Sequence, residues 1–119
     1  MRYLSAEWLR AVDDAVAAIV VDPATAVVIE QRVVDGPDGD VVYRLVVGGG
    51  RCRVVVGDDP AAGVSITTPW KLAEQIASGA ASAQRAFLHG EIRIGGDPAL
   101  LVRHADLAAE LSEALSSIA

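Results

Sequence analysis

The sequence has few aromatic residues, a single cysteine and no long apolar run. Aromatic side chains make up 4% of the 119 residues, so the apolar 52% of the chain is almost entirely aliphatic. The lone cysteine, Cys52, excludes an internal disulfide and fits a reducing compartment. No apolar stretch approaches the roughly 20 residues of a membrane-spanning helix, and residues 1–7 lack the apolar core of a signal peptide. We therefore expect a cytoplasmic protein without stable membrane insertion.

Basic residues are also scarce. Ten Lys and Arg against sixteen Asp and Glu give a net charge of −6. Proteins that bind nucleic acid neutralise phosphates with basic side chains, and anionic membrane surfaces attract the same residues. The acidic balance therefore argues against a nucleic-acid partner. A chain of this length suits one domain with one core, and we expect a single domain over residues 1–119.

Alternation of apolar and polar residues predicts five strands. The five segments are 27–33, 41–47, 51–56, 64–67 and 91–94. Strict alternation indicates a sheet with one buried face and one solvated face. Short turns at residues 35–40 and at Gly48-Gly49-Gly50 indicate that the first three strands form an antiparallel meander. A crossover would then lead to the two remaining strands.

Helical spacing of apolar residues predicts helices before, between and after the later strands. Ser5 is expected to cap the first helix, which should end at Asp22-Pro23. Thr68-Pro69 and Asp97-Pro98 each read as an N-cap followed by the first helical residue, and Ser82 as the cap of a short helix. The prediction is an α+β fold in which a five-stranded mixed sheet has helices packed on one face.

The two faces of this sheet are expected to differ in polarity. The residues predicted to lie buried under the helices are Val54, Val56, Ile66, Ile92 and Ile94. The charged residues predicted on the open face are Glu30, Arg32, Arg44, Arg51, Arg53, Glu91 and Arg93. Opposite charges on that face can pair across strands.

Residues 78–101 carry a family resemblance. The segment combines a helix rich in small residues with a glycine, an alternating strand, Gly-Asp and a leucine-bearing helix; the positions are Gly90, Ile92, Ile94, Gly96, Asp97, Leu100 and Leu101. With residues 50–54 and 63–67 as the third and fourth strands, the chain resembles the sterol-carrier-protein (non-specific lipid-transfer) domain, as a short bacterial-type member. It departs from the family at Ala62, where an acidic residue is common, and residues 116–119 are not a peroxisomal targeting signal.

The resemblance implies a slot for an apolar ligand between the helices and the inner face of the sheet. A sterol, fatty acid or acyl-CoA would be bound there, and could be carried, without catalysis. Such a site needs apolar walls with few polar groups. The candidate ligand-binding residues are Val16, Val56, Ile66, Leu72, Ile76, Phe87, Ile94, Leu101, Leu107, Leu111 and Leu115.

Two other functions stay open on the sequence alone. One is an accessory or protein-interaction domain with a filled core, which could act as a homodimer. The other is a small enzyme that uses Asp97, His89 or His104. No nucleophile, base and orienting group stand together in the sequence, and neither histidine has metal-binding spacing to another ligand. We therefore expect no catalytic residue, no metal and no cofactor.

Overall fold

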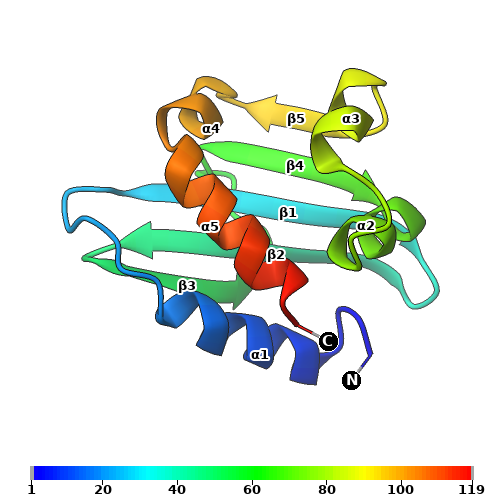
Figure 1. Cartoon of the computed structure of the whole chain (residues 1–119), viewed down its shortest axis with the longest axis horizontal. Coiled ribbons are helices and arrows are strands. Elements are labelled where there is room, and N and C mark those ends of the chain that lie inside the picture. The colour runs from blue at the N-terminus through cyan, green and yellow to red at the C-terminus, as the bar shows by residue number, and fades with distance from the viewer. Residues whose placement is uncertain (1, 119) are drawn as a thin grey trace.

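The computed structural model describes residues 2–118, in which five strands and five helices are found (Figure 1). Their order is α1 (Ala6–Ala17), β1 (Val27–Gly36), β2 (Gly39–Gly48), β3 (Arg51–Val56), β4 (Val64–Pro69), α2 (Trp70–Ala77), α3 (Ala83–Leu88), β5 (Arg93–Gly96), α4 (Ala99–Arg103) and α5 (Ala105–Ser116). Ser5 caps α1 by accepting the Trp8 N–H at 3.1 Å, and Ser82 caps α3 in the same way.

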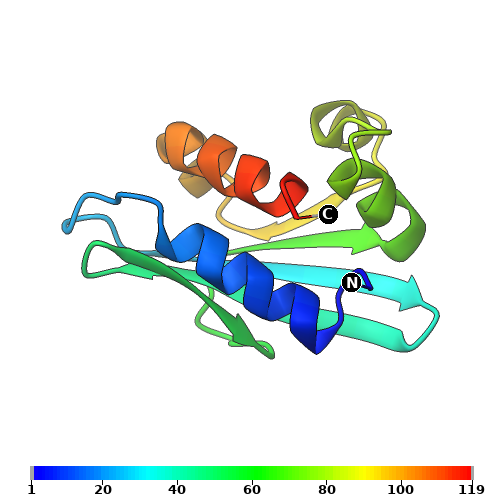
Figure 2. The same cartoon turned by 60° about the horizontal axis from the view of Figure 1, so that its bottom comes forward.

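The strands form one mixed sheet in the order β3-β2-β1-β4-β5. β1 pairs antiparallel with β2 and parallel with β4, and the other neighbours pair antiparallel. The helices lie on one side of this sheet, with α1 beside β3 and α5 crossing the middle strands (Figures 1 and 2). The predicted α+β fold, with a meander, a crossover and two further strands, is confirmed.

The glycines at two points have a structural reason. Gly49 and Gly50 form the two-residue turn between β2 and β3, and their φ angles of 60° and 80° match a type I′ hairpin turn. Gly96, with φ of 75°, lies so close to Gly63 that an added Cβ would sit 2.5 Å from the Gly63 carbonyl oxygen. The Asp97 N–H then donates to that same oxygen, which fixes the end of β5 against the start of β4.

Residues 57–63 carry the chain from the edge strand β3 across β2 and β1 to β4. Three strand spacings are about 14 Å, which seven residues can span. The loop is held from the face opposite the helices. Arg44 Nε donates to the Gly57 carbonyl at 3.0 Å, and the Asp59 N–H donates to the Glu30 carboxylate at 3.1 Å. Glu30 is therefore buried, and its predicted place on a solvated face is wrong because the crossover covers it.

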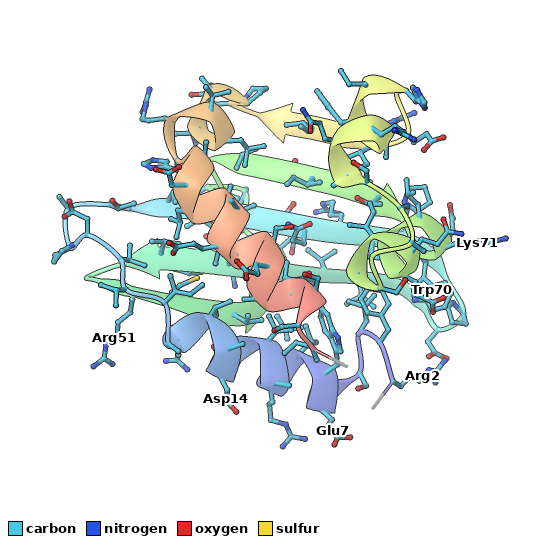
Figure 3. The ribbon with its side chains drawn as sticks, in the orientation of Figure 1. Arg2, Glu7, Asp14, Arg51, Trp70 and Lys71 are labelled. Carbon is cyan, nitrogen blue, oxygen red and sulfur yellow. The ribbon has the colours of Figure 1, made fainter. Side chains whose placement is uncertain are left out.

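The core lies between the inner face of the sheet and the helices. Its most deeply buried side chains are Val12, Val16, Leu45, Cys52 and Val64. On the outer side of α1, Glu7 and Asp14 point away from the sheet (Figure 3). The period of two in the strands and of about four in α1 therefore separates apolar from charged side chains as expected.

Five further sequence predictions are corrected. α1 ends at Ala17, before the predicted end at Asp22-Pro23, and α4 begins at Ala99 with Pro98 rather than Asp97 at its N-cap. Val56 is 64% exposed rather than buried, because it ends the edge strand β3 and has no strand on its outer side. Thr68 does not cap α2: β4 continues through Pro69 and the helix begins at Trp70. β5 begins at Arg93, two residues later than predicted. The other residues expected under the helices, Val54, Ile66, Ile92 and Ile94, are half-buried.

Candidate functional site

A cavity of about 390 Å³ lies between the inner face of the sheet and the helices. Its floor is formed by side chains of β1, β2 and β4: Ile29, Gln31, Val33, Tyr43, Leu45, Ile66 and Thr68. Its walls come from the helices and their connections: Tyr3, Trp8, Ala73, Ile76, Ala77, Gly79, Ala81, Ala83, Ile92, Leu101, Ala108, Leu111, Ser112, Leu115 and Ser116. The volume falls within the range of small-molecule sites, which are concave and mostly apolar.

Small side chains on α2 and α5 explain why this space is open. Ala73 and Ala77 face the cavity from α2, and Ala108 faces it from α5. An alanine at an inward position leaves room that a leucine would fill. Leu111 and Leu115, one helical turn apart on α5, roof the rest, and Leu111 is almost fully buried.

Four of the five aromatic residues form a series of ring contacts, and three of them, Tyr3, Trp8 and Tyr43, line the cavity. The Tyr3 and Trp8 rings meet edge to face with centroids 4.9 Å apart, and Trp8 lies 6.1 Å from Tyr43. The ring of Trp70, labelled in Figure 3, is the next in this series, with its centroid 6.2 Å from that of Tyr3. Such aromatic pairs add about 0.5–1.5 kcal/mol each beyond their burial. They tie the segment before α1 to the sheet and to the start of α2.

The two tyrosines of this cluster are neutral over the physiological pH range. Burial, with a further contribution from Glu74, raises the pKa of Tyr3 to about 12. Burial, with a further contribution from Tyr3, also raises the pKa of Tyr43. Tyr43, which lines the cavity, therefore carries a protonated hydroxyl that can both donate and accept a hydrogen bond.

The cavity brings together five of the eleven candidate ligand-binding residues: Ile66, Ile76, Leu101, Leu111 and Leu115. Val16 is fully buried in the core, and Ile94 packs against it half-buried. Leu72 is half-buried outside the lining, while Val56 and Phe87 are exposed. Leu107 also packs against the core, and it lines a second hollow of about 450 Å³ between the α1–β1 connection and the α4–α5 turn.

Several lining residues were not among the candidates. Gln31 faces the cavity from the middle of the central strand, and its signal was present in the sequence: it falls on the inward positions between Ile29 and Val33. Tyr3 precedes the first helix, where no periodic pattern marks its direction. The inward alanines carry no distinctive signal, because alanine occurs on both faces of helices.

The chemistry of the lining is apolar and uncharged. Among the described residues, every lining side chain is aliphatic, aromatic, hydroxyl or amide. Across residues 2–118, no group of three or more His, Cys, Asp or Glu side chains is arranged to hold a metal ion. No helix within that same range is long and apolar enough to cross a membrane.

Comparison with known proteins agrees with this architecture. The SCP-2 sterol transfer family matches residues 7–109. No curated protein sequence matches the chain. Among solved structures, a sterol carrier protein 2 has a TM-score of 0.79 at 17% identity, with 99% of this chain and 100% of that chain covered.

Two further structures share the fold. A conserved hypothetical protein of Thermus thermophilus, described as possibly a sterol carrier protein, has a TM-score of 0.72 at 20% identity, covering 100% of this chain and 91% of its own. The palmitated SCP2L2 of Aedes aegypti has a TM-score of 0.64 at 22% identity, covering 94% and 95%. Because the family match spans most of the sequence, the chain belongs to the SCP-2 sterol transfer family.

Proposed function

We propose that the protein binds one apolar ligand of the lipid class in the cavity under α5 and carries it without catalysis. The observation that supports this most is the cavity itself, about 390 Å³ of space walled by aliphatic and aromatic side chains of the central strands and of α2 and α5. Family membership supports the same function, as does the palmitated state of the mosquito protein with this fold. The buried lone thiol fits a reducing compartment, and we propose that this compartment is the cytoplasm.

Burial of an alkyl chain supplies enough free energy for such binding. Each buried methylene contributes about 0.8 kcal/mol, so twelve contribute roughly 10 kcal/mol before the cost of association. That cost is at least about 4 kcal/mol, so twelve methylenes alone give a dissociation constant on the order of tens of micromolar at the tightest. The polar groups of the cavity then add selectivity to an affinity that is mainly hydrophobic.

Native mass spectrometry tests the proposal directly. The protein purified from cells should show a mass above that of the denatured chain, and the excess should correspond to an apolar compound extractable into organic solvent. The delipidated protein should bind the apolar dye N-phenyl-1-naphthylamine with micromolar affinity and a rise in dye fluorescence. Equal native and denatured masses, together with no dye binding, would defeat the proposal.

The alternative of an accessory or interaction domain required a filled interior. The space enclosed by α2, α5 and the sheet does not favour that alternative. The comparisons lend no support to the homodimer that was considered with it.

A further inference from the structure

The floor of the cavity is not uniformly apolar. Gln31 lies on β1, the central strand, and is paired with Tyr43 on β2 and with Ile66 on β4. Residues paired directly across neighbouring strands place their side chains on the same face, about 5 Å apart at Cβ. Thr68, two residues beyond Ile66, adds a hydroxyl on the same face. An amide and two hydroxyls therefore form one uncharged polar row on an otherwise apolar floor.

Within residues 2–118, the side chains of this polar row have no hydrogen-bond partner. None of the side-chain hydrogen bonds found among residues 2–118 involves Gln31, Tyr43 or Thr68. No fully buried side-chain nitrogen or oxygen in that range lacks a partner either, so the polar atoms of these three cavity-lining residues are not completely buried. A ligand that displaces water from these groups without bonding to them leaves them unpaired at a cost of about 1–3 kcal/mol each, whereas a ligand that hydrogen bonds to them avoids that cost.

We propose that Gln31, with Tyr43 opposite it, anchors an uncharged hydrogen-bonding terminus of the ligand, such as a hydroxyl, and disfavours an ionised carboxylate. This inference rests on the proposed function and specifies the ligand class of the same site. The Gln31 amide offers two donors and one acceptor, and the Tyr43 hydroxyl offers one donor, so together they satisfy a group that both donates and accepts.

The absence of a cation in the lining supports the selectivity. No described lining residue is Lys, Arg or His. An ionised carboxylate brought to the floor would lose its hydration without gaining an ion pair, and that loss is far larger than for a hydroxyl. A fatty acid would bind with its carboxylate kept at the mouth, away from Gln31, and would bury less of its chain.

Dye displacement distinguishes the two termini on one chain length. The delipidated protein is loaded with N-phenyl-1-naphthylamine at pH 7.5 and titrated with 1-dodecanol or with dodecanoate. We expect dodecanol to bind roughly tenfold more tightly or better. Gln31→Leu should weaken dodecanol binding about 2- to 10-fold relative to dodecanoate binding, the equivalent of one hydrogen bond. Gln75→Leu removes an exposed amide on α2 outside the cavity and is the matched control.

A measurement on the unmodified protein covers the case in which Gln31→Leu fails to fold. The sequence contains three glutamines, Gln31, Gln75 and Gln84, and no asparagine, so a ¹⁵N correlation spectrum shows only three side-chain amide pairs. Dodecanol should shift one pair strongly and leave the pairs of the exposed Gln75 and Gln84 in place. Dodecanoate should not produce that shift.

The outcomes of these experiments distinguish failure of the Gln31 anchor from failure of the proposed apolar-ligand function. If the dye binds but dodecanoate competes as well as dodecanol, or if dodecanol moves none of the three amide pairs, the anchoring role of Gln31 is wrong and the apolar-ligand function stands. If neither the dye nor either amphiphile binds, the proposed function fails and the anchor fails with it.

Discussion

The carboxylate of Glu30 on the central strand accepts the backbone N–H of Asp59 at 3.1 Å, and so β1 holds the crossover between β3 and β4. The same carboxylate accepts a hydrogen bond from Arg32 Nε at 2.8 Å, and Glu30 is almost fully buried. Arg44, the cross-strand partner of Glu30, binds the crossover at the Gly57 carbonyl instead of pairing with Glu30. The two opposite charges therefore fasten one loop from adjacent strands.

Replacing Glu30 by glutamine should destabilise the protein. Glutamine keeps the shape of the side chain. Its amide nitrogen cannot accept a hydrogen bond, however, so it loses the bond to either the Asp59 N–H or Arg32 Nε. Loss of one charge-assisted hydrogen bond costs about 1.5–3 kcal/mol in the free energy of unfolding, measured by urea denaturation. Glu91→Gln, at an exposed position, is the control and should change stability by less than about 0.5 kcal/mol. Equal effects of the two variants would show that Glu30 does not hold the crossover.

Asp13 protects the edge of the sheet. Its carboxylate accepts the Val54 N–H at 2.8 Å, across 41 positions of sequence, on the outer side of β3. Asp13→Ala leaves that N–H without its partner and should cost about 1–2 kcal/mol, with faster hydrogen exchange at the Val54 amide. Asp13→Asn keeps an acceptor oxygen and should recover most of the loss.

Asp14 provides the matched control for this edge contact. It neighbours Asp13 on α1 but points to solvent (Figure 3). Asp14→Ala should leave Val54 exchange unchanged, since only Asp13 reaches the strand. Exchange at Val54 that is equally fast in the wild type and in Asp13→Ala would contradict the edge contact. Arg53, 3.9 Å from Asp13, is mostly exposed and adds little.

Cys52 should titrate only at alkaline pH. Burial, with a further contribution from Asp13, raises the pKa of its thiol to about 11, from an ordinary value near 9. Between these values the unfolded chain loses the proton that the folded chain retains. The free energy of unfolding should therefore fall as pH rises from about 9 to 11. Cys52→Ala should flatten this part of the stability profile in urea titrations, apart from the contribution of the tyrosines.

A thiol reagent gives a second readout of the same burial. At pH 8 the disulfide reagent DTNB should react slowly with the native protein and rapidly with the urea-unfolded protein, because the thiolate is the reactive form. Rapid stoichiometric reaction in the native state would contradict the buried, protonated thiol.

Local periodicity predicted the parts of the fold that depend on local sequence. Alternation predicted that Val54 points inward and Arg53 outward, and the glycines predicted the short turn at Gly49 and Gly50. Alternation could not predict the exposure of Val56, because it does not say which strand is at the edge. Nor could it predict the burial of Glu30, which depends on the path of a crossover 29 residues away.

The cavity was harder to predict than the fold. Among the candidate leucines of the last helix, Leu111 and Leu115 line the cavity and Leu107 does not. Phe87 was also a candidate, but within α3 only Ala86 is buried and only Ala83 lines the cavity, while the phenylalanine is 44% exposed. An empty space is made by residues that are small, such as Ala73 and Ala108, and no sequence pattern marks the volume that they leave.

Leu111→Trp tests whether that space takes up a ligand. Enlarging a buried side chain in a filled core normally costs about 1–3 kcal/mol, because neighbours must move. Leu111 is 2% exposed, yet it borders a cavity of about 390 Å³ into which an indole can extend. We therefore expect the melting temperature to change little, while uptake of a fluorescent fatty acid is abolished. Leu88→Trp adds the same ring at a 77% exposed position outside the cavity and should preserve uptake. A Leu111→Trp protein that melts several degrees lower, with a wild type that takes up no apolar probe, would instead indicate a filled interior in solution and favour the accessory-domain alternative.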